Sequence, residues 1–300
     1  MNTGTLKKQK RLEALSGYAF IAPQIIGFAV FVLVPLCMIF VYSFQERNLL
    51  FGTSTFAGLS NYRELLEDDL FRKTLVNTLV FSLGVVPLNL ALSLALALYV
   101  GGGSRGVGFV RSIIFLPVIT SGVAWSIVCK YLLQGGETGP INWFLMHIGL
   151  GGHNWLYEKG WAMLSVIVCR VLKNLGMNVL IFIGAVLNMP QDVIEAGKID
   201  GAGKWRLFWS IKLPLLMPTV LMVTIVTVIG SMRVFDTIKL MTDGGPEGST
   251  MVMVYYIYHK AFKMFDTGYA STLSVVLFLI VLVLTLAQWS LRKKVSYYEN

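Results

Sequence analysis

Long stretches without a charged residue are the most constraining feature of this 300-residue chain. They include residues 14–45, 74–104 and 267–291. A helix that crosses a bilayer needs about 20 consecutive, mostly apolar residues, and each of these stretches is longer than that. Because backbone polar groups inside lipid must be satisfied within the segment itself, we expect an all-α, polytopic membrane protein.

The composition also favours lipid over water as the surroundings of most of the chain. Hydrophobic residues make up 55% of it and charged residues 14%, whereas soluble domains carry about 25% charged residues. The net charge of +9 does not indicate nucleic acid, because the basic residues stand at the ends of apolar stretches, as topology signals do. The three cysteines lie inside apolar stretches and predict no disulfide framework.

Six transmembrane helices are predicted. The fourth is interrupted by Arg170 and Lys173, but the strongly apolar residues 177–187 complete it. A further charge-free stretch, 138–157, contains several Gly residues and a Pro, which break helices, so we expect only a short interfacial helix there. The six predicted spans are 18–43, 73–100, 107–131, 161–187, 214–236 and 268–291. The interfacial helix is expected at 141–150, with Trp143 and Trp155 at headgroup level.

Lys and Arg residues predict the orientation. They cluster before the first span, between spans two and three, between spans four and five, and after span six. These four clusters fall on one face only if both termini are cytoplasmic. The acid-rich loop at 44–72 and the loop at 132–158, which lacks Lys and Arg, are then outside. The clustered residues are Lys7, Lys8, Lys10, Arg11, Arg105, Arg111, Lys198, Lys204, Arg206, Lys212, Arg292, Lys293 and Lys294.

Sequence motifs for catalysis are missing. The glycine-rich stretch 101–106 lacks the lysine and the strand-to-helix context of a phosphate loop, and we interpret it as a tight turn. No G-x-S-x-G or H-E-x-x-H motif occurs, and the histidines His147, His153 and His259 lack metal-ligand spacing. We therefore assign no catalytic residue, no metal site and no bound cofactor to this chain.

The loop between spans four and five predicts a short helix at the membrane surface. Asn188 can cap it, with Pro190 in its first turn and Asp192 near its positive dipole end. Small residues recur on one predicted face, and Gly203 can end the helix. This face consists of Val193, Ala196, Gly197 and Gly201. Two interpretations are open at this point: an ordinary amphipathic connector, or a surface to which another protein backbone approaches closely.

The motif in this loop resembles the EAA loop of binding-protein-dependent ABC importer permeases. It reads Glu195-Ala196-Gly197, then Gly201, then Ile211-x-Leu213-Pro214. In that family the loop is the coupling helix that docks onto the ATPase subunit. The family usually has alanine where this chain has Gly197, which lowers helix propensity by about 1 kcal/mol. The resemblance implies that the coupling loop 190–213 and its flank contact an ATPase through Glu195, Ala196, Gly197, Asp200, Gly201, Ile211, Leu213 and Pro214.

Further matches extend this resemblance to most of the chain. It looks like the six-span sugar permeases related to the maltose-system MalF subunit, through Ala22-Pro23, Val34-Pro35, Tyr42-Ser43-Phe44, Asn77-Thr78, Arg111 to Pro117, Gly139 to Asn142, Phe235-Asp236, Thr242 to Pro246, Thr250 and Gly268 to Ser271. The resemblance implies a type I ABC importer transmembrane domain over 1–300, in which 1–72 holds the N-terminal tail, first helix and periplasmic loop. Residues 73–291 would form the five-helix core.

The partners that the resemblance implies are other chains and a carbohydrate. They are ABC ATPase subunits that bind ATP and Mg, a second and different permease, and a periplasmic solute-binding protein. The expected location is the bacterial inner membrane. The sequence leaves open which sugar is carried and whether it is neutral or anionic.

Polar residues inside the predicted spans are candidates for the substrate pathway. Arg170 and Lys173 would each cost about 2.5–3.5 kcal/mol if they faced lipid at mid-bilayer, so both must face protein or water. Asn174 and Asn178 continue their stripe. The stripe is either a wall of the pathway, contacting sugar hydroxyls or an anionic substrate, or polar packing against a partner, or snorkelling. Asn89, two residues after Pro87, is a weaker candidate with a structural alternative.

Three further interpretations remain open on sequence alone. Arg233 and Asp236 are spaced for an i,i+3 ion pair. The Met- and Tyr-rich loop 240–266 either meets a binding protein or forms an interfacial aromatic belt. A self-sufficient secondary transporter or channel is the alternative function, but it needs an ion-coupling site and facing broken helices, and no two-fold hydropathy symmetry is evident. A membrane enzyme or scaffold is disfavoured by the missing catalytic motifs.

Overall fold

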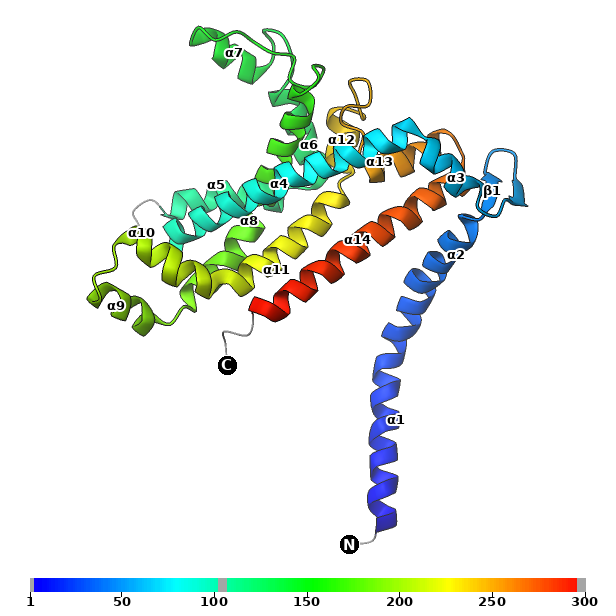
Figure 1. Cartoon of the computed structure of the whole chain (residues 1–300), viewed down its shortest axis with the longest axis horizontal. Coiled ribbons are helices and arrows are strands. Elements are labelled where there is room, and N and C mark those ends of the chain that lie inside the picture. The colour runs from blue at the N-terminus through cyan, green and yellow to red at the C-terminus, as the bar shows by residue number, and fades with distance from the viewer. Residues whose placement is uncertain (1–2, 102–106, 296–300) are drawn as a thin grey trace. The chain divides into compact units, whose positions relative to one another are not determined.

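The computed structural model describes residues 3–101 and 107–295, and helices dominate them (Figure 1). The chain divides into two compact units. The first holds residues 1–65 and 260–276, and the second holds 66–259 and 277–300. The predicted glycine-rich turn, from 102 on, and Arg105 lie outside the described residues.

The first unit begins with one long apolar helix. It runs through α1 (Thr3–Phe28), a π-helical turn η1 (Ala29–Leu33) and α2 (Val34–Tyr42). No residue in its most apolar 18-residue window is buried within the chain. Pro35 lies within this continuous helix, directly after the π-helical turn, and cannot donate a backbone hydrogen bond there.

A small antiparallel hairpin follows this helix and was not predicted. Its strands are β1 (Gln45–Asn48) and β2 (Thr53–Phe56). The strands are only four residues long and lack the apolar alternation that identifies a strand in sequence. The Asn61 side chain of α3 (Ser60–Glu67) donates to the carbonyls of Ser43 and Gln45, at 3.1 and 3.0 Å. The hairpin is thereby fixed at the end of α2.

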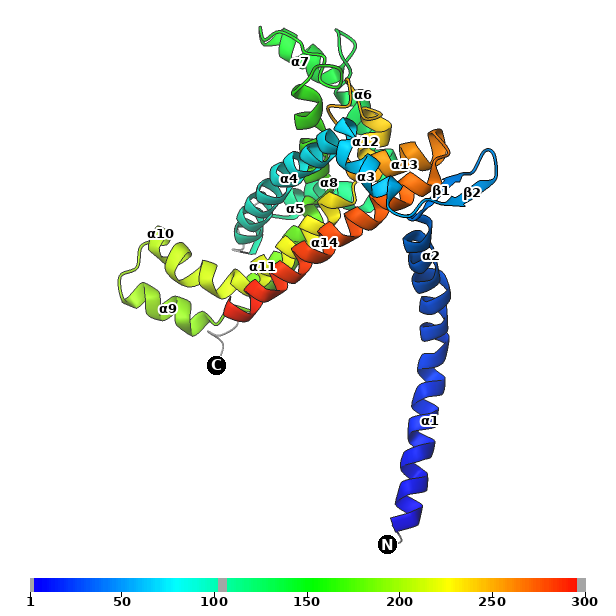
Figure 2. The ribbon, with the colours of Figure 1, turned by 45° about the vertical axis from the view of Figure 1, so that its right-hand side comes forward.

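Three long helices form the core of the second unit. They are α4 (Asp69–Gly101), α8 (Trp161–Leu187) and α11 (Leu213–Met232). The later part of α14 (Thr267–Val295) also belongs to this unit. The pair α4 and α8 packs along much of its length (Figures 1 and 2). Phe81 and Val85 of α4 are fully buried against Val166 and Ile167 of α8. These side chains form an apolar core inside the bundle.

The third predicted span is a bent pair of helices. It consists of α5 (Val107–Ile119) and α6 (Gly122–Leu132), which meet at 111°. Ser121 between them is extended, and its Oγ accepts a hydrogen bond from the Ala124 N–H at 3.1 Å, as an N-cap does. Within the described residues, five continuous helices are long and apolar enough to cross a membrane. Counting the bent pair as one span gives the six that the sequence predicts.

Short elements close the two ends of the second unit. The helix α7 (Pro140–His147) confirms the predicted short helix. It lies at one end, and α9 (Gln191–Ile199) with α10 (Lys204–Leu207) lies at the other (Figures 1 and 2). Trp155, which is predicted to lie at headgroup level, donates its indole N–H to the Asn142 side chain at 2.7 Å. The loop that contains α7 and the loop that contains α9 and α10 therefore lie at opposite ends of the second unit, as the six-span topology requires.

One sequence interpretation between spans five and six is wrong, and burial narrows a second. Arg233 and Asp236 form no ion pair within the described residues, because α11 ends at Met232 and α12 (Asp236–Met241) starts a new helix. The four residues Met241, Met253, Tyr255 and Tyr256 are buried. They belong to the core around α12 and α13 (Met253–Tyr258), so of the Met and Tyr residues between positions 241 and 258 only Met251 and Tyr258, which are half-buried, remain candidates for a docking surface or an aromatic belt.

Candidate functional site

The helix α9 is the centre of the predicted coupling loop. Its N-cap is Pro190, and Asp192 lies in its first turn, where the helix dipole favours a carboxylate. The prediction that Asn188 caps this helix is wrong. Asn188 is the C-cap of α8, where both its backbone N–H and its side-chain N–H donate to the Gly184 carbonyl, at 3.2 and 2.7 Å.

Gly201 ends α9 and is not part of its face. The N–H of Ala202 donates to the Gly197 carbonyl at 3.0 Å, and that of Gly201 donates to the Lys198 carbonyl at 3.1 Å. These two bonds define a Schellman motif, whose C′ residue adopts the left-handed conformation. Gly201 has φ of +75°, which a residue with a Cβ adopts only at a cost. Gly201 therefore does not belong to the predicted small-residue face of α9, because the helix ends before it.

One side of α9 is packed against its own chain. Ile194 is buried, and Gly197 lies directly on Ile211, with Leu207 beside it. A Cβ at Gly197 would meet the tip of the Ile211 side chain. This contact gives a structural reason for glycine where the family resemblance predicts alanine. Gly197 is thus buried within the chain and is not open to another protein's backbone, contrary to the prediction.

The buried side of α9 connects it to three long helices. Ile194 shares a buried cluster with Met189, Leu207 and Leu216. Leu94 and Leu98 of α4, Ala185 and Val186 of α8, and Val220 of α11 pack against this cluster. A nine-residue helix is too short to be stable alone in water. Its position is therefore set by the ends of α4, α8 and α11.

The opposite side of α9 faces outward. Val193 is 45% exposed and Ile199 is 85% exposed, which is unusual for two aliphatic side chains on one short helix. Of the predicted coupling residues, Glu195, Ala196, Asp200, Gly201 and Pro214 are exposed and Ile211 and Leu213 are half-buried. The exposed part therefore combines apolar and acidic groups.

The predicted polar stripe of α8 lines a cavity at the bent pair. Lys173, Asn174 and Asn178 contribute to a cavity of about 250 Å³ between α5, α8 and α11. Thr227 and Gly230 of α11 and Val118 of α5 complete its wall. Neither Arg170 nor Asn89 is among its lining residues. The structure thus brings three of the five predicted pathway residues together.

Asn178 also joins three helices through its side-chain amide. It donates to the Asn89 Oδ1 of α4 and to the Thr227 Oγ1 of α11, the latter at 3.1 Å. Asn89 in turn donates to the Val171 carbonyl of α8 at 3.1 Å. All three side chains are buried. Asn89 therefore connects helices, in line with the structural alternative for this residue.

Lys173 and Arg170 both reach backbone carbonyls at helix breaks. The Lys173 ammonium donates to the Pro117 and Thr120 carbonyls at the end of α5. The Arg170 guanidinium donates to the Gly230 carbonyl at 3.2 Å and also interacts electrostatically with Asp236. The Asp236 carboxylate lies over Gly122 at the start of α6. Both cations therefore face protein, as the cost of exposing them to lipid requires.

Sequence reasoning missed two parts of this site. Thr227 is the hydroxyl partner of Asn178, and its position within an apolar span was the only available signal. The acceptors at Pro117 and Thr120 were missed because the third span was treated as one helix. The Pro117-Val-Ile-Thr-Ser-Gly122 stretch, with a proline, a cap residue and a glycine, is the signal that could have revealed the break.

Comparison with known sequences gives matches over nearly the whole chain. Residues 74–297 match the family described as binding-protein-dependent transport system inner membrane component. The lactose transport system permease protein LacF of Rhizobium radiobacter is 33% identical over 296 residues, covering 96% of this chain and 98% of that protein. The trehalose/maltose transport system permease protein MalF of Thermococcus litoralis is 31% identical over 290 residues, covering 95% and 96%.

A solved structure has the same fold. It is the crystal structure of a bacterial ABC transporter involved in the import of the acidic polysaccharide alginate. One of its chains matches with a TM-score of 0.84 and 22% sequence identity, covering 97% of this chain and 98% of that one. The fold described above, over nearly the whole chain, is therefore also that of the matched chain.

Proposed function

The chain belongs to the family of binding-protein-dependent transport system inner membrane components, and from this premise we propose that it is a sugar permease of an ATP-driven importer. The relatives named for lactose and for trehalose and maltose support a saccharide or saccharide derivative as the substrate. The observation that carries the proposal is the two-sided packing of α9, with one side buried among the ends of three spans and the other exposed.

In this proposal α9 transmits motion from an ATPase to the membrane. A partner that moves the exposed side, with Glu195, Ala196 and Ile199, displaces the buried cluster around Ile194. Since that cluster includes residues of α4, α8 and α11, the inner ends of these spans shift together. Close-packed interiors pass on such displacements because they have low compressibility.

The cavity beside the bent pair is the proposed part of the substrate pathway. Asn174 and Lys173 of α8 and Thr227 of α11 line this cavity with an amide, an ammonium and a hydroxyl. Amides and hydroxyls both donate and accept hydrogen bonds, which suits the hydroxyl groups of a sugar. We assign Asn174 and Lys173 to substrate contact, and Arg170 and Asn89 to holding the helices around the cavity.

The proposed complex contains three further kinds of chain. An ATPase subunit binds ATP and Mg and docks on α9, a second and different permease completes the pathway, and a solute-binding protein delivers the sugar from outside. Both termini are then cytoplasmic, so that α9 and the basic clusters face the ATPase. Reporter fusions at the N-terminus and within loop 132–158 test this orientation by the compartment in which each reporter is active.

Reconstitution of the complex into liposomes tests the function. The chain is purified from its native membrane, the associated chains are identified, and sugar uptake is measured with and without ATP. We expect uptake only with ATP and the complete complex. Gradient-driven uptake by this chain alone would contradict the proposal and favour the secondary-transporter alternative.

A matched pair of variants tests the role of α9. Ala196→Trp places a bulky side chain on its exposed side, and Ala14→Trp places the same side chain on exposed α1. We expect the Ala196 variant to insert and assemble but to lose most ATP-driven uptake, while the Ala14 variant keeps it. Equal uptake by both variants would exclude α9 as the transmitting element.

A further inference from the structure

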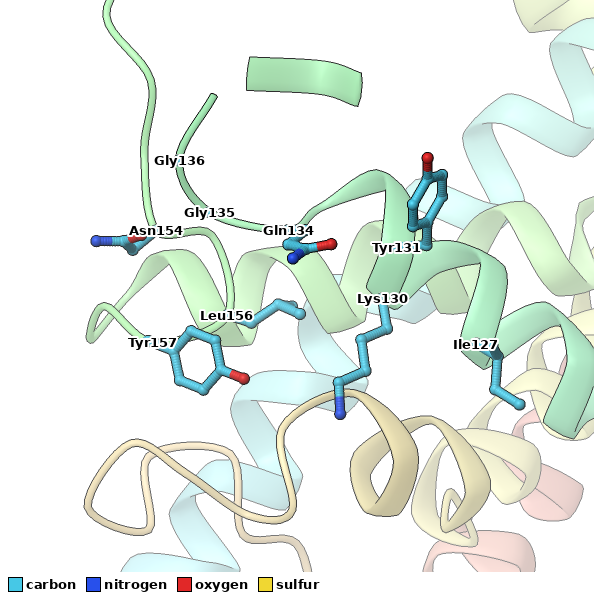
Figure 3. Close-up of a pocket in the computed structure, with 9 residues that line it drawn as sticks. All are labelled: Ile127, Lys130, Tyr131, Gln134, Gly135, Gly136, Asn154, Leu156 and Tyr157. Carbon is cyan, nitrogen blue, oxygen red and sulfur yellow. The ribbon is translucent and has the colours of Figure 1, made fainter. Parts of the chain in front are cut away.

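A second and larger pocket lies at the end of the second unit opposite α9. Its volume is about 670 Å³, within the range of small-molecule sites. Lys130 of α6, Gln134 in the turn after α6, and Asn154 and Tyr157 before α8 line it (Figure 3). Figure 3 shows Lys130 and Tyr157 reaching toward the same region, below Gln134. Under the predicted topology, this pocket opens on the outer side.

The walls of this pocket are held in place by a hydrogen-bonded scaffold. Asn142 of α7 donates to the His153 carbonyl at 2.8 Å and accepts from the His153 N–H at 3.2 Å. Asn154 accepts from the Tyr157 N–H at 2.9 Å. Behind the pocket, Leu156 is buried in an apolar cluster with Cys129, Cys169 and Met241. The segment 153–157 and the apolar floor behind the pocket are therefore held in place without a ligand.

The polar side chains that line the pocket are not used by the fold. Within the described part of the chain, Lys130, Gln134, Asn154 and Tyr157 make no side-chain hydrogen bond or ion pair with one another or with other residues. By contrast, Asn142 and Trp155 nearby are bonded to each other. One ammonium, two amides and one phenol thus remain available to a ligand at a single concave site.

These groups match the chemistry of an acidic sugar. A pyranose has an apolar C–H face and a rim of hydroxyls, and Tyr157, which is 67% exposed, offers an apolar ring with a polar tip. Gln134 and Asn154 can each donate to and accept from hydroxyls. Lys130 adds a positive charge without a carboxylate partner among the described residues, which favours a ligand that carries its own carboxylate.

We propose that the pocket lined by Lys130, Gln134, Asn154 and Tyr157 binds a uronic-acid unit of the transported saccharide before it enters the membrane. This inference rests on the proposed sugar-import function and names its substrate class. A lipid headgroup shares the anionic chemistry, and the experiment below separates it.

Binding to the purified chain in phosphatidylcholine nanodiscs tests this inference. The probes are D-galacturonate and D-galactose, which differ only in a carboxylate at C6, and saturation-transfer NMR measures binding. We expect wild-type protein to prefer galacturonate. Lys130→Ala should raise the Kd for galacturonate about tenfold, in line with loss of a charged hydrogen bond, and should leave galactose nearly unchanged. Lys130→Arg should retain the preference.

Two further variants separate the pocket from general surface effects. Tyr157→Leu should weaken both sugars, because it removes the ring, whereas Trp143→Leu alters an exposed aromatic of α7 outside the pocket and should change neither. The proposal is overturned if wild-type protein shows no galacturonate signal, or if Lys130→Ala and Tyr157→Leu bind like wild type. Displacement of galacturonate by phosphatidylglycerol in the nanodisc would assign the pocket to a lipid headgroup and also overturn it.

This assay needs neither ATPase nor uptake. A failure here therefore leaves the importer proposal intact, and loss of ATP-driven uptake in the α9 variant leaves galacturonate binding unaffected.

Discussion

Lys173 of α8 donates a hydrogen bond to the backbone carbonyl of Thr120, at the break between α5 and α6. This bond satisfies a backbone group that the bend removes from its helix, and it places a cation at the negative end of the α5 dipole. The bend between α5 and α6 thus explains why α8 carries a lysine at this position, and the lysine explains how the bend is stabilised. A lysine that seemed costly within a span stabilises the irregular backbone beside it.

Replacing Lys173 should destabilise the bent pair. In Lys173→Met the Pro117 and Thr120 carbonyls lose their shared donor, at a cost of about 1–3 kcal/mol for a buried unsatisfied group. Lys173→Arg keeps a donor and should lose less. Thermal unfolding of both variants in nanodiscs measures the difference. A Met variant as stable as wild type would mean that water satisfies these carbonyls.

The Asn89–Asn178 hydrogen bond should contribute a measurable coupling energy between α4 and α8. Polar side chains that bond across helices in membranes couple by about 0.6 kcal/mol on average, and by up to about 1.7. A double-mutant cycle with Asn89→Leu and Asn178→Leu should fall in this range. Ser112→Leu on the exposed side of α5 serves as the uncoupled control. Strict additivity of the Asn variants would contradict the observed pairing.

Gly201 and Gly203 offer a test of backbone conformation alone. An added Cβ meets nothing within 4 Å at either residue, but φ is +75° at Gly201 and −63° at Gly203. Gly201→Ala should therefore cost about 1–2 kcal/mol of local stability, while Gly203→Ala should cost much less. Amide exchange in α9 reports the effect, which should be faster only in the Gly201 variant. Equal exchange in both variants would argue against the Schellman end.

Gly197 and Ile211 should show compensating effects. Gly197→Ala gains about 1 kcal/mol of helix propensity, but its Cβ meets the Ile211 Cδ1. We expect the single variant to be nearly neutral in stability. Ile211→Val removes that methyl group. The double variant should therefore be more stable than the sum of the two single changes in unfolding free energy predicts, as measured in a thermal double-mutant cycle. If Gly197→Ala alone is about 1 kcal/mol more stable than wild type, the Ile211 side chain moves aside without cost.

The loop after α12 should respond to acid through Glu247. A hydrogen bond from Lys159 and its charge lower the pKa of Glu247 below its ordinary value. The pair therefore stabilises the loop above the unfolded-state pKa, and this contribution is lost as the pH falls through the lowered folded pKa. In Lys159→Met, NMR titration of the Glu247 carboxyl should give a higher pKa. An unchanged titration would mean that the pair does not persist in solution.

The spans were predictable from sequence because their signal is local. About 20 apolar residues in a row need no partner to identify them, and 161–187 was located within the bounds of α8 despite its two charges. The bend at Ser121 was not predictable in the same way. Proline is tolerated within membrane helices when other groups satisfy the backbone, and here the donor is Lys173 on another helix.

The coupling loop was predicted in its motif but not in its geometry. The spacing of Glu195, Gly201 and Pro214 identified the loop, whereas a periodic helix was assumed to continue through Gly201. Periodicity cannot reveal that a glycine adopts positive φ and stops the helix. The burial of Gly197 likewise depends on Leu207 and Ile211 folding back over it. Such contacts form between elements and leave no trace in local spacing.

Under the proposed function, the two sides of α9 have separate tasks: the exposed side recognises the ATPase, and the buried side passes its motion to the spans. Glu195 and Ile199 are exposed, while Ile194 and Gly197 are buried against the cluster that includes Leu207 and Ile211. The exposed residues of α9 can therefore be replaced to fit a different ATPase without disturbing the packing of the spans. Grafting only those exposed residues from another permease would then change the ATPase that the chain binds and leave its transported substrate unchanged.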